Sequence, residues 1–337
     1  MNTEAKRWTF IDQFRGFAII SMILVNVCNE LSVSPSWLRH HDYGFTFADY
    51  VAPAFIFIVG FGYRLSLTKA LSSNTMNEVH KKFIRRYCII TFLGFIYGHF
   101  DFEVAVWDAL TDIGIAGLLM YPVMRLRGIF ILLLGLFYLT MYQCLFTLTS
   151  YGEWVMKHSI DGGPLGPLSW AFILAFGAFY ATLFEKHIFP EGKLSDKIRK
   201  KQALKTLLSW FILGCLISIS GIFMVNLPFI DISIPFTQKG MTASYSLFSS
   251  GLCGISLVMF YLLNEFIRIV IPFVNTMGKN PLVLYFLQAI LIFLTTSLLP
   301  DEIKQNNLSP YVLGFCIILV CYIVARTLEK KSIYIKV

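Results

Sequence analysis

The sequence contains little charge, and this excludes a soluble enzyme domain. Only 14% of its 337 residues are charged, whereas 56% are hydrophobic and the mean hydropathy is +0.67. Soluble domains contain about 25% charged residues. A soluble chain of this length cannot cover so much apolar surface, so we interpret it as an integral membrane protein.

Cysteine pairs at metal-binding or redox spacings are also missing. The seven cysteines all lie in or beside apolar segments, and none forms a CxxC pattern. We therefore interpret them as small core residues and expect no metal. The chain has no lipidation motif, and its first apolar run has no small-residue cleavage pattern. We expect this run to be a retained helix and not a signal peptide.

Ten apolar segments are present, each close to the length of about 20 residues that a membrane-spanning helix requires. They are 14–33, 48–68, 84–100, 106–124, 128–148, 167–184, 206–226, 245–263, 280–299 and 309–326. The weakest is 106–124, because it contains Asp108 and Asp112. The loops between the segments are too short for a soluble domain. We predict an all-α polytopic membrane protein with about ten transmembrane helices, in which residues 1–337 form a single domain.

The basic residues are divided unequally between the two sets of loops. If the segments alternate across the membrane, 24 of the 28 Lys and Arg residues fall on the side of both termini. The other side holds Arg39, Lys157, Lys239 and Lys304. The positive-inside rule therefore predicts that both termini are cytoplasmic. This basic inner face accounts for the net charge of +8, so no nucleic-acid partner is expected.

The first outward loop combines histidines with carboxylates. It includes His40, His41 and Asp42, and Asp49 follows near the start of the second helix. Histidine is the side chain best suited to move protons near neutral pH, so His40 and His41 are candidate general bases. A solvated polar loop is the main alternative. A metal site is less favoured, because adjacent side chains converge poorly on one ion. Asp49 is either a helix cap or a functional carboxylate.

Other polar residues lie in apolar surroundings. Asn26 is deep in the first segment, where an amide packs against another helix or lines a cavity. Asp108 and Asp112 share one helix face, and carboxylates in hydrocarbon are usually functional unless they lie at the membrane surface. The basic segment 81–86 on the inner side either anchors the topology or binds lipid head groups or a polyphosphate ligand.

A series of short motifs runs in order from residue 9 to about residue 290. They are Asp12-x-x-Arg15-Gly16-Phe17-Ala18-Ile19, Val25-Asn26, the histidine loop, Gly44-Phe45-Thr46-Phe47-Ala48-Asp49, Pro53-Ala54-Phe55-Ile56-Phe57-Ile58-Val59-Gly60, Ile84-Arg85-Arg86, Lys239-Gly240-Met241-Thr242-Ala243-Ser244-Tyr245-Ser246-Leu247-Phe248 with Gly251, and Gly278-Lys279-Asn280-Pro281-Leu282. Together they resemble the heparan-α-glucosaminide N-acetyltransferase family of transmembrane acyltransferases.

The resemblance implies an acyl-CoA-dependent transmembrane acetyltransferase. Such an enzyme moves an acetyl group from cytoplasmic acetyl-CoA to an amine or hydroxyl of a glycan-type acceptor on the non-cytoplasmic side. The expected partners are acetyl-CoA, a carbohydrate acceptor and membrane lipids, and the oligomeric state is left open. Because the chain has no large luminal domain, we expect a bacterial cytoplasmic (inner) membrane and not a lysosome.

The resemblance also assigns roles to individual residues. The family's central histidine falls at His40-His41. It usually lies five residues before the glycine that Gly44 matches, whereas His40 here lies four before it. We favour His40, with His41 as the alternative. Asn26 matches the family's asparagine near the acyl group.

For the coenzyme, Thr242 and Ser244 match hydroxyl residues associated with the CoA tunnel. Cations are needed for its phosphates on the inner side, and the candidates lie in the matched motifs. They are Arg15, Arg85, Arg86 and Lys279, with Asn280 beside the last. Where the family often has a Gln-Arg pair, this chain has Thr111-Asp112, so that pair's phosphate contact is not carried over.

Acyl transfer needs a base for the acceptor's proton and dipoles for the developing oxyanion. A histidine and an asparagine amide supply both, in either a direct or a ping-pong mechanism through an acetylated histidine. The alternative function is a membrane transporter, such as an exporter of a sugar or lipid-linked glycan. Transporters often contain inverted repeats, and the sequence has no clear pairing of halves. A structural or assembly protein is a third class.

Overall fold

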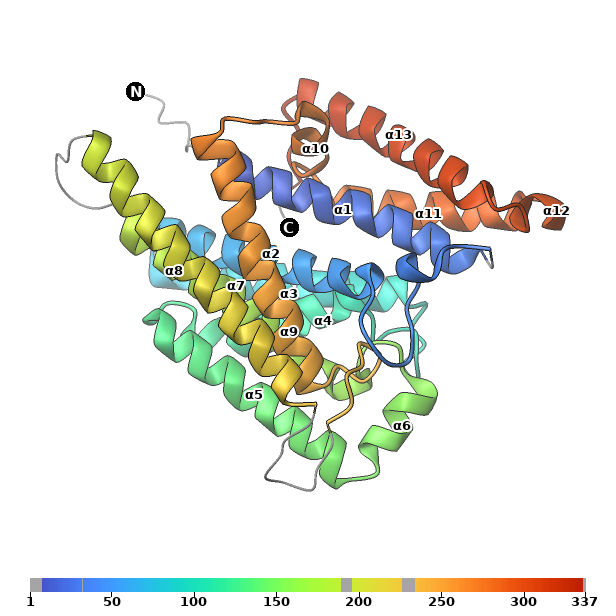
Figure 1. Ribbon diagram of the computed structural model, residues 1–337, viewed down its shortest axis with the longest axis horizontal. Coiled ribbons are helices and arrows are strands. Elements are labelled where there is room, and N and C mark those ends of the chain that lie inside the picture. Colours follow the sequence, from blue (N-terminus) through green and yellow to red (C-terminus); the bar gives the residue numbers. More distant parts are fainter. Residues whose placement is uncertain (1–7, 32, 189–195, 226–233, 336–337) are drawn as a thin grey trace. The chain divides into compact units, whose positions relative to one another are not determined.

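The structure, a computed structural model, describes residues 8–31, 33–188, 196–225 and 234–335. Over these ranges it is helical and contains no strand. The same ranges contain eight helices that are long and apolar enough to cross a membrane, and a shorter apolar helix spans Ala109–Val123. The prediction of an all-α polytopic membrane protein is therefore confirmed (Figure 1).

The chain divides into two compact units. Among the described residues, the first unit comprises those within 8–40, 46–55 and 256–335, and the second comprises those within 41–45 and 56–255. Helices α2 (Phe47–Leu71) and α9 (Ala243–Tyr261) contribute residues to both units. The expectation of one domain over residues 1–337 stays a prediction.

The first unit is built around α1 (Thr9–Glu30), which packs against α10 (Pro272–Met277), α11 (Pro281–Leu298) and α13 (Ser309–Lys330). Figure 1 shows α1 in blue beside α11 and α13 in orange and red. A β-carbon on Gly16 would lie 1.8 Å from the Val274 carbonyl oxygen, and one on Gly278 would lie 1.7 Å from the Asp12 carbonyl oxygen. These two motif glycines therefore let the backbones of α1 and α10 touch, as small residues do in membrane helices.

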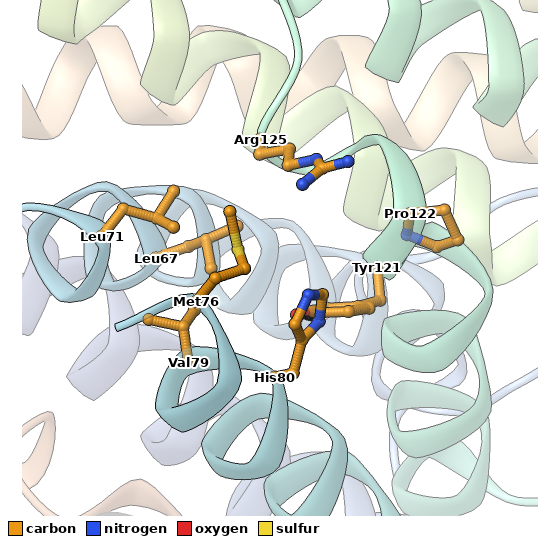
Figure 2. Close-up of a pocket in the computed structure, with 8 residues that line it drawn as sticks. All are labelled: Leu67, Leu71, Met76, Val79, His80, Tyr121, Pro122 and Arg125. Carbon is orange, nitrogen blue, oxygen red and sulfur yellow. Dashed lines mark hydrogen bonds between the residues drawn. The ribbon is translucent and has the colours of Figure 1, made fainter. Parts of the chain in front are cut away.

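The second unit is built around α7 (Gly166–Ile188), which packs against α4 (Ala109–Met120), α5 (Gly128–Leu148) and α8 (Asp196–Phe223). Helix α3 (Met76–Tyr97) packs against α4. Most of α7 is buried inside the protein, which explains why its sequence is apolar on every side. A cavity lies where the end of α2, the start of α3 and the segment after α4 meet (Figure 2).

The ten predicted segments all correspond to helices, but several ends differ. Helix α3 starts at Met76 and not at residue 84, because Thr75 and Glu78 form a capping box ahead of the apolar half. Helix α8 starts at Asp196, ten residues before the predicted segment. The weak segment 106–124 is a short helix, α4, followed by a 3₁₀ turn at Tyr121–Val123.

Short helices that the sequence pattern did not predict are α6 (Tyr151–His158), α10, α12 (Asp301–Lys304) and the 3₁₀ turns at Ser36–Leu38 and Gly163–Leu165. A π-helical turn at Leu262–Phe266 follows α9. They lack a long apolar run, so hydropathy alone does not reveal them. The cytoplasmic location of both termini stays a prediction. Much of the basic loop 186–205 that supports it lies outside the described residues.

Candidate functional site

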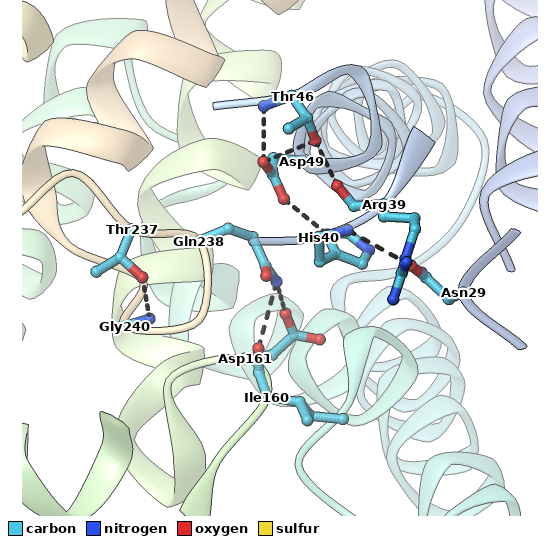
Figure 3. A network of polar contacts seen from close by, with 10 residues as sticks. All are labelled: Asn29, Arg39, His40, Thr46, Asp49, Ile160, Asp161, Thr237, Gln238 and Gly240. Atoms are coloured by element: carbon cyan, nitrogen blue, oxygen red, sulfur yellow. Dashed lines mark hydrogen bonds and ion pairs between the residues drawn. The ribbon is translucent and has the colours of Figure 1, made fainter. Parts of the chain in front are cut away.

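His40 and Asp49 form a side-chain pair in the first unit (Figure 3). His40 Nδ1 lies 2.6 Å from Asp49 Oδ1. The Asp49 side chain is only 1% exposed, whereas that of His40 is 37% exposed. A buried carboxylate therefore holds one nitrogen of an imidazole that is open to solvent. This leaves Nε2 as the nitrogen for proton exchange with a substrate.

Asp49 is the third residue of α2, and its two oxygens have different partners. Oδ1 contacts His40, while Oδ2 accepts a hydrogen bond of 2.8 Å from the Thr46 backbone N–H. The Thr46 hydroxyl lies 3.0 Å from the same Oδ2 and 3.0 Å from the Arg39 carbonyl oxygen. The sequence left capping and function as alternatives for Asp49. The geometry shows a helix-start contact through one oxygen and a histidine contact through the other.

The loop that carries His40 is tied down at both ends. The His40 backbone N–H points to Asn29 Oδ1, 3.4 Å away, in the last turn of α1. The following residues belong to the second unit, where the Gly44 N–H donates to the Phe236 carbonyl oxygen at 2.8 Å. Gly44 has a φ of 98°, a conformation that favours glycine. His41 is exposed, and the structure pairs His40 with Asp49.

Asn26 is half-buried and contacts another helix. Its Nδ2 donates to Gln288 Oε1 of α11 at 3.2 Å, within the first unit. No hydrogen bond joins Asn26 to His40 in the part of the chain that the structure describes. The interhelical contact expected of an amide at this depth is present. The family role of Asn26 near the acyl group stays a prediction.

Three candidate coenzyme residues lie in the first unit with partners of their own. Lys279 forms an ion pair with Glu329 of α13, and Asn280 accepts a hydrogen bond of 2.9 Å from the Ile335 N–H. Arg15 lies 3.6 Å from Asp12, one helical turn earlier. Lys279 and Asn280 therefore fix the start of α11 to the C-terminal segment.

The other four coenzyme candidates lie in the second unit. Arg85 is exposed, and Arg86 is half-buried with a buried Nε that has no hydrogen-bond partner among the described residues. The hydroxyls of Thr242 and Ser244 lie 3.1 Å apart at the start of α9, and Ser244 donates to the Pro235 carbonyl oxygen at 2.8 Å. Within the described part of this unit, no hydrogen bond links the two arginines to the two hydroxyls.

A second polar network, also drawn in Figure 3, was not predicted from the sequence. In the second unit, Gln238 donates through Nε2 to Asp161 Oδ1. Nearby, the Tyr151 hydroxyl donates to the Gly162 carbonyl oxygen at 2.7 Å and accepts from the Leu165 N–H at 2.9 Å. Burial raises the pKa of Tyr151 to about 12. The signal in the sequence is the run of glycine and proline at residues 162–167, and such a run indicates only a backbone turn.

Asp108 and Asp112, which share a helix face, differ in their contacts. Asp108 is the N-cap of α4, and its Oδ1 accepts a hydrogen bond of 2.7 Å from the Ala109 N–H. Asp112 is fully buried, and neither of its oxygens has a hydrogen-bond partner within the described residues. A β-carbon on Gly166 would lie 3.7 Å from Asp112 Oδ1, so the start of α7 packs against this carboxyl group.

Comparison with known proteins adds two findings. The chain is 32% identical over 124 residues to a Bacillus acidopullulyticus protein described as "Uncharacterized 39.9 kDa protein in amylase 3'region". The alignment covers 35% of this chain and 34% of that protein, so the chain spans about a third of the length of this relative.

The family described as "Heparan-alpha-glucosaminide N-acetyltransferase, catalytic" matches residues 7–191, which is more than half of the chain. The matched range contains the His40–Asp49 pair and α1 to α7. Together with the apolar helices, the match identifies an integral membrane protein. The chain therefore belongs to the heparan-α-glucosaminide N-acetyltransferase catalytic family.

Proposed function

We propose that this protein transfers an acetyl group from cytoplasmic acetyl-CoA to an amine or hydroxyl of a glycan-type acceptor on the non-cytoplasmic side of the membrane. The observation that supports the proposal is the 2.6 Å contact between His40 Nδ1 and Asp49 Oδ1. It gives a solvent-accessible imidazole a buried carboxylate partner, which is the arrangement of an oriented general base. His40 is also the histidine we favour for the family's position.

In this reaction, His40 Nε2 takes the proton from the acceptor nitrogen or oxygen as that atom attacks the thioester carbonyl. The carbon–sulfur bond then breaks, and the departing thiolate takes the proton from the imidazolium. Asp49 is a positioning residue that fixes the ring and stabilises its positive charge. Asn26 uses one N–H on Gln288, and its second N–H is our candidate donor to the oxyanion.

For acetyl-CoA, Arg85 and Arg86 are the preferred phosphate ligands. Neither forms an ion pair within the described ranges, whereas Lys279 and Arg15 lie beside Glu329 and Asp12. A charge-assisted hydrogen bond contributes roughly 1.5–3 kcal/mol. Thr242, Ser244 and Asn280 remain proposed contacts of the coenzyme.

A binding experiment tests the donor. The double variant Arg85→Gln/Arg86→Gln should bind acetyl-CoA at least about tenfold more weakly than the parent, as measured by thermal shift or calorimetry. Lys81→Gln/Lys82→Gln removes the same charge from the same helix and should change affinity little. If both double variants bind acetyl-CoA as tightly as the parent does, the arginines only anchor the topology.

A turnover experiment tests the reaction. The purified protein should release free CoA from acetyl-CoA when an amino sugar is added, whereas an exporter should not. Acetylated protein that accumulates without acceptor would identify a ping-pong route, and its absence would favour direct transfer.

We also propose a bacterial cytoplasmic membrane as the location. A cysteine introduced at position 193, outside the described residues, should then react with a membrane-impermeant reagent only after the cells are opened. Labelling of intact cells would reverse the proposed orientation.

A further inference from the structure

A cavity of about 290 Å³ lies in the second unit (Figure 2). One side is apolar and is formed by Leu67 and Leu71 of α2 with Met76 of α3. His80, Tyr121 and Arg125 add polar groups to the lining. The cavity therefore offers a ligand both an apolar wall and donors for a negative charge.

The backbone on both sides of Arg125 is anchored by a second arginine. Arg64 of α2 donates to the carbonyl oxygens of Met124 and of Leu126, and its Nε pairs with Glu185 at 3.1 Å. Its guanidinium is thus committed to holding this segment. Arg125 itself is exposed and forms no hydrogen bond or ion pair within the described residues. A guanidinium in this state retains five N–H donors for an anion.

His80 is also held in place at this cavity. The Tyr121 hydroxyl and His80 Nδ1 share a hydrogen bond that joins α3 to the turn after α4. His80 Nε2 makes no hydrogen bond within the described ranges. In the tautomer whose Nδ1 accepts from the tyrosine hydroxyl, Nε2 carries the proton and is a second donor.

The elements around the cavity carry much of the basic charge of the second unit. Lys69 lies at the end of α2, Lys81 and Lys82 lie near the start of α3, and Arg127 follows Arg125. The positive-inside rule predicts that these helix ends face the cytoplasm. At the cytoplasmic surface of a membrane, basic pockets between helices bind the phosphates of anionic lipids.

We propose that this cavity binds an anionic phospholipid of the inner leaflet. Its phosphate contacts Arg125 and His80, because a guanidinium takes a phosphate in a bidentate manner. The first part of an acyl chain lies along Leu67, Leu71 and Met76, where its apolar surface is removed from contact with water. The cavity is near the lower end of the size range for small-molecule sites and one side is apolar, which favours a lipid over a whole coenzyme A molecule.

The test uses the full-length protein in detergent, titrated with phosphatidylglycerol or with phosphatidylcholine and followed by native mass spectrometry. The parent should retain phosphatidylglycerol in preference to phosphatidylcholine. Arg125→Gln should weaken phosphatidylglycerol binding about tenfold, the effect of one charge-assisted contact. Arg127→Gln is the matched control. It removes the same charge, but Arg127 lies two residues after Arg125 and does not line the cavity. It should behave as the parent.

Two results would overturn the proposal. Equal losses in Arg125→Gln and Arg127→Gln would show that surface charge alone attracts the lipid. Displacement of phosphatidylglycerol by acetyl-CoA, with displacement lost in Arg125→Gln, would make the cavity a coenzyme site. Both variants are at exposed positions, and an unchanged melting temperature without lipid would verify their folding. None of these results depends on acetyl transfer.

Discussion

Asp49 and Asp112 occupy similar places in their own units but have opposite surroundings. Each lies in the first turn of an apolar helix, and each is almost completely buried. Asp49 uses both oxygens, one on His40 and one on the Thr46 N–H. Asp112 has no hydrogen-bond partner for either oxygen in the described structure.

Two carboxylates that are both buried near the start of a helix can therefore have different roles, depending on their hydrogen-bond partners. Burial of a charged group costs free energy unless hydrogen bonds or an opposite charge compensate it. At Asp49 the compensation comes from a histidine and a helix start, so the group orients its neighbour. Among the residues that the structure describes, Asp112 has no such hydrogen-bond partner and orients no neighbouring side chain through one. The helix N-terminus is common to both, so it does not explain the difference.

The largest effect is expected when the partner of Asp49 is removed. His40→Ala removes the imidazole that contacts Oδ1 of Asp49. It should lower acetyl transfer by roughly 10²–10⁴-fold, the usual contribution of a general base. Binding of acetyl-CoA should remain largely intact. His41→Ala is the control, and it should lower the steady-state rate of acetyl transfer less than His40→Ala does. Full activity in both single variants and in the double variant would contradict the histidine mechanism.

A smaller effect is expected when only the charge of Asp49 is removed. Asp49→Asn keeps the size of the group and an acceptor for the Thr46 N–H, but it no longer compensates an imidazolium. The turnover number should fall roughly 10–100-fold, as for other groups that orient a functional imidazole. The dissociation constant of acetyl-CoA should not change. Partial rescue by Asp49→Glu would support a positioning role, whereas equal turnover in the parent and Asp49→Asn would exclude it.

The same substitution should affect thermal stability differently at the two carboxylates. Asp49→Asn should lower the free energy of unfolding by about 1–3 kcal/mol, because a buried charge-assisted contact is lost. Asp112→Asn should change stability little, because it breaks no hydrogen bond among the described residues and replaces one partnerless polar group with another of the same size. Melting curves in one detergent measure both. A loss at Asp112 as large as that at Asp49 would mean that Asp112 has a stabilising partner.

The smallest effect concerns Tyr151, near the second polar network. Tyr151→Phe removes two hydrogen bonds and should cost about 1 kcal/mol. The pKa of Tyr151 is raised to about 12 from a usual value of 10. Its contribution to stability is therefore present below pH 10 and is lost as the pH rises toward 12.

The alkaline loss of stability should accordingly be smaller in Tyr151→Phe than in the parent, as measured by melting temperature against pH. Tyr138→Phe is the matched control, because its hydroxyl makes no hydrogen bond in the described part of the chain. Parallel pH profiles for the parent and Tyr151→Phe would contradict the assignment.

The sequence predicted the helices well because long apolar runs carry a strong signal. It missed the charged start of α3, since the capping box at Thr75 and Glu78 is polar and lies ahead of the apolar run. It also gave His40 and Asp49, which are nine positions apart, as candidate site residues. The fold was needed to show that His40 is the histidine that contacts Asp49.

The sequence alone did not predict which residues far apart in the chain form hydrogen bonds with one another. Asn26 and Gln288 are separated by 262 positions, and Asp161 and Gln238 by 77. A single sequence shows that an amide or a carboxylate needs a partner, but it does not show which one. The cavity near Arg125 was missed for the same reason, because its wall joins three separate segments.

The contact between Gly16 and α10 has a consequence for how the protein is made. Helix α1 leaves the ribosome well before α10, which begins only at Pro272. At about 5–20 residues per second, synthesis of the intervening chain takes on the order of tens of seconds. During that time the glycine face of α1 has no native neighbour. The first unit closes only when about the last quarter of the chain has been inserted, so a nascent chain that stops earlier presents this face to the cell's membrane quality control.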